Sequence, residues 1–459
     1  MKYKMIYIIW SLAMLLLGGM FSCSDFLDAD PPRNEVITET AFTDDATATS
    51  TVLGIYSEMA KSGNFIVGRD GSIAVLNGFS GDELVPRFFN DFFTNTILAN
   101  NVTVLSSLWQ PGYNFIYFSN SLLEGLEETT GITEETKRQL EGEARFIRAL
   151  CYFYLVNLFG DIPMVTTTDF EVNRLAARTP KEQVYQQIIT DLQHSRELLA
   201  EDYSFSNEER VRPNRAVAEA LLARVYLFME DWVNAEAQAT AVINNPLYHL
   251  SSDLNEVFLA NSEETIWQLK PVRLNNTEEA LYFVPIRETV QPSASLTDHL
   301  LNAFEEGDNR RIDWIGEVTP STVTLYYPFK YKVHDVQAPP TEYSMVLRLA
   351  EQYLIRAEAR AGQGNITGAL EDINMIRNRA GLEDIMVNTQ EEVLDAIMHE
   401  RRVELFAEAG HRWLDLKRTG KIDEVLSSIK TDWNPTNALY PIPQKERESN
   451  PNLTQNEGY

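Results

Sequence analysis

Cysteine and histidine, which form the disulfides of small extracellular proteins and bind metals, are rare in this sequence. Of its 459 residues, two are cysteines, Cys23 and Cys151, and six are histidines. This composition excludes a small domain held together by disulfides. Cys151 lies among Leu150, Tyr152 and Phe153. We therefore predict that Cys151 is a buried, inert thiol and not a nucleophile.

Positively charged side chains are also scarce. The chain has 39 Lys and Arg against 67 Asp and Glu, which gives a formal net charge of −28. So acidic a protein repels phosphate backbones and anionic lipid headgroups, and this disfavours nucleic-acid binding and electrostatic adsorption to lipid. With 44% hydrophobic residues, the chain still has the composition of a globular protein that buries a substantial core.

The recognisable motifs of catalysis are missing as well. His399-Glu400 continues to Val403, where a zinc protease would need its second histidine. The sequence contains no G-x-S-x-G nucleophile elbow, no phosphate-binding P-loop and no G-x-G-x-x-G after a strand. We therefore expect no catalytic residue, no metal ligand and no cofactor. A pair of glycosidase carboxylates has no recognisable spacing, so a surface glycoside hydrolase remains an alternative.

The first residues have the order of an export signal. Lys2 and Lys4 precede an apolar run over residues 5–17, which is shorter than the roughly 20 residues of a membrane-spanning helix. Ser22-Cys23 then resembles the end of a lipobox, which implies a signal peptide over residues 1–22 and a lipidated Cys23. Residues 23–34 are acidic and contain Pro31-Pro32, as expected of a tether. The alternative is an ordinary signal peptide in which Cys23 is incidental.

The remainder reads as mostly α. Helical periodicity recurs along the chain, while the alternating patterns of strands are sparse. The predicted helices are residues 135–158, about 180–199, 215–230, 233–244, 344–361, 367–379 and 391–409.

Two of the helical pairs share a spacing of small residues. Ala223 and Ala235 are twelve residues apart in one pair, and Ala357 and Ala369 repeat the interval in the other. This approximates a tetratricopeptide repeat, in which small residues let two antiparallel helices approach closely. The alternative is a generic helical bundle.

Two long regions, residues 62–108 and 247–343, lack helical periodicity. Loops of this length on a compact body are usually functional. Aromatic rings suit sugars, whose C–H faces are apolar, although each ring could equally belong to the core. The aromatic residues of these regions include Phe88, Phe89, Phe92, Phe93, Tyr282, Phe283, Trp314, Tyr326 and Tyr327.

A family resemblance appears in residues 144–163. Their sequence, ARFIRALCYFYLVNLFGDIP, resembles a signature of the SusD/RagB family, the outer-membrane nutrient-binding lipoproteins of the Bacteroidota. Cys151 and Phe159 stand where tyrosine is common in that signature. Further blocks are similar to conserved blocks of the family in order and spacing, namely residues 215–227, 348–359, 400–405, 410–418, 439–443 and 450–459.

The resemblance implies a tetratricopeptide-like scaffold of helical pairs that supports a loop-rich, irregular ligand-binding face. It implies one SusD-like domain over residues 35–459, with an N-terminal part to about 225 and a C-terminal part from about 226. The conserved blocks are mostly scaffold, and relatives contact their ligands through variable loops. We therefore expect an aromatic ligand-binding platform in the two irregular regions, made of Phe92, Phe93, Tyr282, Phe283 and Trp314.

The resemblance also implies a function. The protein would be lipid-anchored in the outer membrane and face the cell surface, where it would bind a glycan or oligosaccharide. It would act without catalysis as the lid of a SusC-like, TonB-dependent transporter barrel. A lid with an oligopeptide cargo is the first alternative.

Overall fold

The structure, a computed structural model, describes residues 41–61, 65–272 and 276–459. The expected signal peptide, Cys23 and the tether lie outside these residues. The chain divides into two units, Met1–Ala41 and Phe42–Tyr459, and the description below concerns the second. None of the helices that the structure describes has the length and apolar character needed to cross a membrane.

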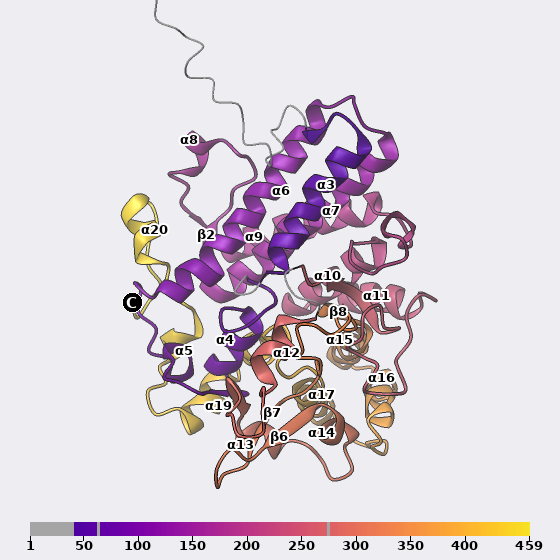
Figure 1. Ribbon diagram of the computed structural model, residues 1–459, viewed down its shortest axis with the longest axis vertical. Coiled ribbons are helices and arrows are strands. Elements are labelled where there is room, and N and C mark those ends of the chain that lie inside the picture. Colours follow the sequence, from indigo (N-terminus) through magenta and orange to yellow (C-terminus); the bar gives the residue numbers. More distant parts are fainter. Residues whose placement is uncertain (1–40, 62–64, 273–275) are drawn as a thin grey trace, which may run out of the picture. The chain divides into compact units, whose positions relative to one another are not determined.

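One half of the described body is a layer of long helices around α7 (Glu134–Phe159) (Figure 1). Thr133 caps its start and Gly160 ends it with a φ of 73°, close to the predicted bounds. Arg148 on α7 donates two hydrogen bonds to Asp191 on a neighbouring helix, at 2.6 and 2.9 Å. Cys151 is buried in the middle of α7, as predicted. The helices beside α7 are α3 (Asp45–Met59), α6 (Gln110–Glu128) and α9 (Lys181–Leu198).

The repeat-like pairs form the adjoining layer. Ala223, Ala235, Ala357 and Ala369 are all fully buried, so the small residues lie where the helices approach closely. The structure thus confirms a mostly helical fold with a tetratricopeptide-like arrangement. The pairs are α10 (Arg215–Phe228) with α11 (Trp232–Ile243) and α15 (Leu349–Gly362) with α16 (Ile366–Arg379). They are followed by α17 (Gln390–Glu404), α18 (His411–Arg418) and α19 (Ile422–Ile429).

Strands in the described residues are short and pair in twos, always antiparallel. The largest pair joins β4 (Thr265–Leu269) to β8 (Ser344–Arg348), with every residue buried. The other pairs are β1 (Leu84–Pro86) with β5 (Ala294–Leu296), β2 (Ile162–Pro163) with β3 (Arg178–Thr179), and β6 (Ile315–Val318) with β7 (Leu325–Pro328).

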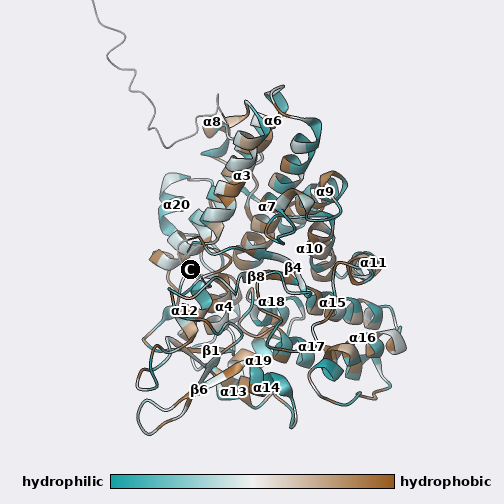
Figure 2. Cartoon of the chain, turned by 45° about the vertical axis from the view of Figure 1, so that its right-hand side comes forward, coloured by the Kyte–Doolittle hydropathy of each residue, from teal (hydrophilic) through white to brown (hydrophobic). Residues whose placement is uncertain are grey.

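Short elements occupy the two irregular regions, the stretches on either side of α9, and the C-terminal part. They hold surface loops against the helical layers, and hydrophobic residues gather between the elements while hydrophilic ones cover them (Figure 2). These elements are α4 (Ile73–Ser80), α5 (Asp91–Thr94), η3 (Val104–Trp109), α8 (Phe170–Asn173), η4 (Ser204–Ser206), α12 (Glu278–Phe283), α13 (Asp298–Leu301), α14 (Asn309–Asp313), η5 (Pro435–Ala438) and α20 (Gln444–Ser449).

The sequence predictions of secondary structure were wrong in several places. Residues 344–348 form a strand, because a fully buried apolar run carries no periodicity that separates strand from helix. The helix predicted to end at residue 409 ends at Glu404, because Ala407 and Ala409 adopt positive φ angles of 55° and 47°. Helices α3, α6 and α19 were not predicted at all.

Candidate functional site

Two loops that are distant in sequence meet at one edge of the body because β1 pairs with β5. The register places Pro86 opposite Ala294, and the backbone N–H of Arg87 donates to the carbonyl of Ser293 at 3.0 Å. Residues 87–90, which follow β1, therefore lie beside residues 284–293, which precede β5. We call the surface formed by these two loops the loop face.

The loop face exposes apolar side chains to an unusual degree. Phe88 is 74% exposed, Phe89 is 80% exposed and Ile286 is 61% exposed. The guanidinium of Arg87 lies 5.2 Å from the ring centre of Phe88, within range of a cation–π interaction. Exposed apolar rings beside polar groups mark a binding surface more often than chance. The loop face is therefore a candidate binding surface for a ligand that has an apolar side.

Just beyond Phe88 and Phe89, the chain turns inward. Asn90 caps α5 by accepting a hydrogen bond from the backbone N–H of Phe92 at 2.9 Å. Phe92 is consequently buried, with its ring edge-on to Tyr440 at a centroid distance of 5.3 Å. Phe93 is half-buried beneath the ammonium of Lys430. Of the two predicted ring residues here, Phe92 belongs to the core and Phe93 remains partly accessible.

The other predicted rings are likewise either buried or half-buried. On α12, Tyr282 is half-buried and Phe283 is buried, with their centroids 5.2 Å apart. Trp314 is completely buried, and its indole N–H donates to the carbonyl of Leu254 at 2.9 Å. The described conformation therefore gives Trp314 no ring face to offer a ligand. The expectation of a platform made of all five predicted rings is corrected to this extent: Phe92, Phe283 and Trp314 lie in the core.

The most exposed rings, Phe88 and Phe89, were not selected from the sequence. A local signal could have found them, since Asn90-Asp91 is a helix-start signal that directs the next aromatic residue inward. Residues before such a cap stay outside the helix. In this segment, the position of the helix cap therefore predicts which rings are exposed and which are buried better than the number of aromatic residues does.

Two buried carboxyl groups lie behind the loop face. Burial, and then the negative charge of Asp82, raise the pKa of Glu83 to about 8. Burial raises the pKa of Glu279 to about 7, although the hydroxyl of Ser344 donates to its carboxyl at 2.8 Å. Glu83 adjoins β1 and Glu279 lies on α12, so both support the elements that carry the face. In the described residues, no three His, Cys, Asp or Glu side chains are grouped to hold a metal ion.

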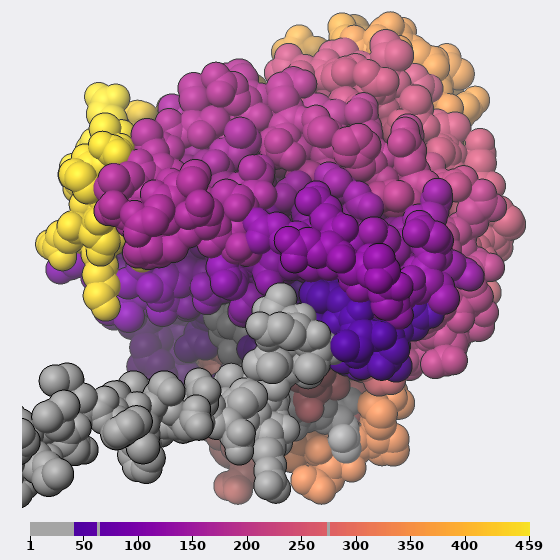
Figure 3. Space-filling view, turned by 90° about the horizontal axis from the view of Figure 1, so that it is seen from above, coloured from indigo at the N-terminus to yellow at the C-terminus, as the bar shows by residue number. Residues whose placement is uncertain are grey.

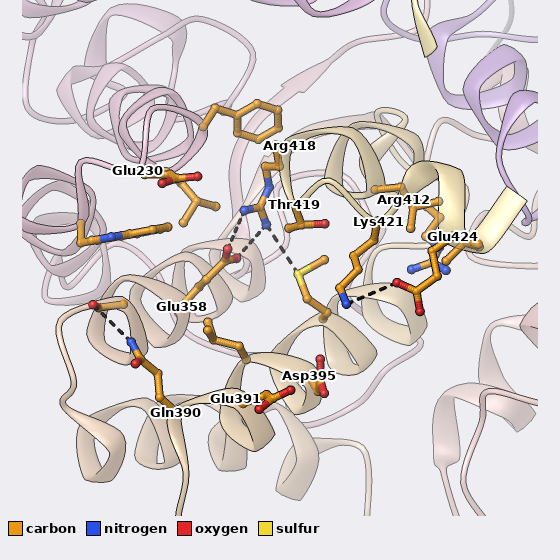
Figure 4. Close-up of a pocket in the computed structure, with 18 residues that line it drawn as sticks. Glu230, Glu358, Gln390, Glu391, Asp395, Arg412, Arg418, Thr419, Lys421 and Glu424 are labelled. Atoms are coloured by element: carbon orange, nitrogen blue, oxygen red, sulfur yellow. Dashed lines mark hydrogen bonds and ion pairs between the residues drawn. The ribbon is translucent and has the colours of Figure 1, made fainter. Parts of the chain in front are cut away.

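A deeper cleft of about 670 Å³ opens between the repeat-like helices and α17, α18 and α19 (Figure 4). Inside it, Arg418 donates to Glu358 at 2.5 and 2.7 Å, so the innermost charges neutralise each other. Trp232 forms part of its apolar wall, and Asp395 lies at its edge. The described residues that line this cleft include none from the loop face and none of the five predicted rings.

Comparisons with known proteins point to one family along most of the chain. A model described as "SusD family" matches residues 313–459, and one described as "Starch-binding associating with outer membrane" matches residues 25–227. SusD-like protein P25 of Formosa agariphila is 26% identical over 97% of this chain and 98% of its own. Starch-binding protein SusD of Bacteroides thetaiotaomicron is 25% identical over 73% of this chain and 75% of its own.

Solved structures confirm the fold. A protein described as a laminarin-binding SusD-like protein superposes with a TM-score of 0.77, covering 91% of this chain and 100% of its own, at 24% identity. The blocks found in the sequence fall within the matched regions, since residues 144–163 and 215–227 lie within 25–227 and residues 348–459 lie within 313–459. The chain belongs to the SusD/RagB family.

Proposed function

We propose that this protein binds a glycan at the cell surface through the loop face and delivers it to an outer-membrane transporter. The observation that carries the proposal is the exposure of Phe88 and Phe89 on a loop that the pairing of β1 with β5 holds in place. The names of two relatives support a glycan as cargo, since one is described as starch-binding and another as laminarin-binding.

The chemistry of the face suits a sugar chain. The apolar C–H faces of pyranose rings can stack on Phe88 and Phe89, while Arg87 and Asn90 offer donors and acceptors to hydroxyl groups. The half-buried rings of Phe93 and Tyr282 would add to the apolar contact with the sugar. The shallow, exposed site favours binding over bond cleavage, because catalysis needs groups held in a water-excluded pocket. We therefore propose a non-catalytic role.

The location and the partner are part of the same proposal. A lipidated Cys23 after a signal peptide over residues 1–22 would anchor the domain, residues 35–459, to the outer membrane. A SusC-like, TonB-dependent barrel would receive the cargo while this protein acts as its lid. The family relationship supports this arrangement, because a model of the family is described by association with the outer membrane.

The test is calorimetric titration of the full chain in detergent against panels of neutral oligosaccharides and oligopeptides, followed by chromatography of each mixture. We expect heat from one glycan class, with the glycan recovered intact, and loss of that heat in a Phe88→Ala/Phe89→Ala variant. Met386→Ala, which removes an equally exposed apolar side chain elsewhere, is the control. Heat from peptides alone would show that the cargo is an oligopeptide and not a glycan. Recovery of cleaved glycan would show that the protein is a surface glycoside hydrolase.

A further inference from the structure

A second cleft lies away from the loop face, where helices from three parts of the chain meet. Helix α8 and helix α20 lie on the same side of α6, with β2 between them (Figure 1). The C-terminal segment containing α20, in yellow, borders the purple and magenta surface of the N-terminal helices (Figure 3). The cleft between these elements has a volume of about 560 Å³.

One wall of this cleft carries aromatic rings on successive helical turns. Trp109, the last residue of η3, and Tyr113 on α6 are four residues apart and both line the cleft. Their rings have centroids 4.9 Å apart, and the hydroxyl of Tyr113 donates to the carbonyl of Pro163 at 2.8 Å. Trp109 is buried and Tyr113 is half-buried, so Tyr113 presents its ring to the cleft and Trp109 supports it.

The opposite wall of the cleft carries a phenylalanine whose ring is largely exposed to solvent. Phe170 lies on α8 and is 70% exposed, although it lines the cleft together with the buried Trp109. Asp169 caps α8 by accepting hydrogen bonds from the backbone N–H groups of Glu171 and Val172. The cap fixes the direction of the short helix, and Phe170 lines the cleft together with Tyr113 of α6.

Polar side chains that both donate and accept hydrogen bonds lie among these rings. Glu446 lines the cleft, and burial raises its pKa although the side chains of Gln110 and Trp109 hydrogen bond to it. Asn114 and Ser449 also line the cleft and carry a donor and an acceptor each. A ligand with many hydroxyl groups would satisfy such a set better than a simple ion.

The charges of the cleft argue for a neutral ligand. Its charged lining residues are Glu446 and Arg174, and Arg174 pairs with Glu171 at 2.7 Å. In a chain with a formal charge of −28, a nearly neutral lining gives little attraction to a basic peptide. Ring faces, amides and one carboxyl group together are the chemistry that recognises pyranose rings and their hydroxyls.

We propose that the cleft between α6, α8 and α20 is a second binding site, for a neutral oligosaccharide, separate from the loop face. The site stacks a sugar ring between Phe170 and Tyr113, whose ring packs on the buried Trp109. Glu446 and Asn114 bind the sugar hydroxyls. With two sites, one chain holds a polysaccharide at two points, so that release from one site does not free the ligand.

The test is hydrogen–deuterium exchange of the full chain in detergent, with and without a mixture of maltohexaose, laminarihexaose, cellohexaose, xylohexaose and mannohexaose. We expect slower exchange in residues 164–176 and 444–453 when sugar is present. A Phe88→Ala/Phe89→Ala variant should keep this protection while losing that of residues 86–93. Phe170→Ala in that background should weaken the remaining binding about three- to tenfold.

Two further variants make the result specific. Val172→Ala removes a side chain of α8 that is 61% exposed and does not line the cleft, and it should leave protection unchanged. Glu446→Gln keeps the shape of the side chain and should weaken binding as Phe170→Ala does.

The possible results separate this site from the proposed function. Protection confined to the loop face, or residual binding unaffected by Phe170→Ala and Glu446→Gln, would overturn the second site and leave the proposed function standing. Protection confined to the cleft would support the second site and overturn the proposed role of the loop face. No protection by any of the sugars would overturn both.

Discussion

The ammonium group of Lys430 lies 2.9 Å from the side-chain oxygen of Asn95, although the two residues are 335 positions apart. The same ammonium approaches the carbonyl oxygens of Phe79, Ser80 and Phe93 at 2.6 to 2.9 Å. Asn95 has a positive φ of 57° at the end of α5. Lys430 thus fixes the segment on which Phe88 and Phe89 are carried, from the far end of the chain.

Replacing Lys430 with methionine should loosen this segment. The change leaves several buried oxygens without a donor, and we expect it to lower the free energy of unfolding by roughly 2–4 kcal/mol. Urea unfolding followed by circular dichroism measures the loss. Lys421→Met, at an exposed lysine paired with Glu424, is the matched control and should change stability little. Equal unfolding midpoints for Lys430→Met and the wild type would contradict the role assigned to Lys430.

Trp314 and Phe89 should respond to alanine in opposite ways. Trp314→Ala empties a fully buried site and should cost about 3–5 kcal/mol of stability. Phe89→Ala removes an exposed ring and should leave the melting temperature unchanged while weakening glycan binding. Differential scanning calorimetry and titration calorimetry on the same samples separate the two effects. Normal stability of Trp314→Ala would show that this ring is not part of the core in solution.

The contrast between these rings shows where sequence reasoning succeeds and where it stops. Helices such as α7 could be predicted because apolar spacing, the cap at Thr133 and the stop at Gly160 are all local signals. The burial of Trp314 could not be predicted, because Phe258, Lys330 and Arg348 surround its ring from other parts of the chain. An aromatic residue in a region without periodicity can face either way, and only the tertiary fold decides.

The buried ion pair between Arg224 and Glu351 should couple the two repeat-like pairs. Arg224 on α10 donates to both oxygens of Glu351 on α15, each at 2.7 Å. Arg224→Met leaves a buried carboxylate unpaired and should cost about 3–5 kcal/mol. The double variant Arg224→Met/Glu351→Met should cost less than the sum of the single variants, and a double-mutant cycle in urea measures this difference. Additive losses would show that the pair contributes no coupling.

Glu83 should make stability depend on pH. Its pKa is raised from its usual value near 4.5 to about 8, because the folded protein buries it beside Asp82. The folded state therefore holds a proton that the unfolded state loses, and stability falls as pH rises from about 4.5 to about 8. Glu83→Gln keeps the neutral form at every pH.

The measurement for Glu83 is urea unfolding of both proteins between pH 5 and pH 9, where the wild type should lose stability relative to Glu83→Gln as pH rises. The difference should level off above about pH 8, since the carboxyl group is then ionised in both states. A constant difference across this range would mean that Glu83 ionises in the folded protein as it does in water. Glu424→Gln, at an exposed glutamate, is the control and should show no such trend.

The attachment of the loop face to the C-terminal part of the chain has a consequence for the order of folding. Tyr440 places its hydroxyl 2.8 Å from that of Ser80 and donates to the side-chain oxygen of Asn77 at 2.9 Å. Synthesis proceeds from the N-terminus, so the early helices can pair long before residues 430–440 have left the ribosome. The loop face, which we propose as the sugar-binding surface, is consequently completed late. We expect a prematurely terminated chain to contain Phe88 and Phe89 and still be unable to hold cargo.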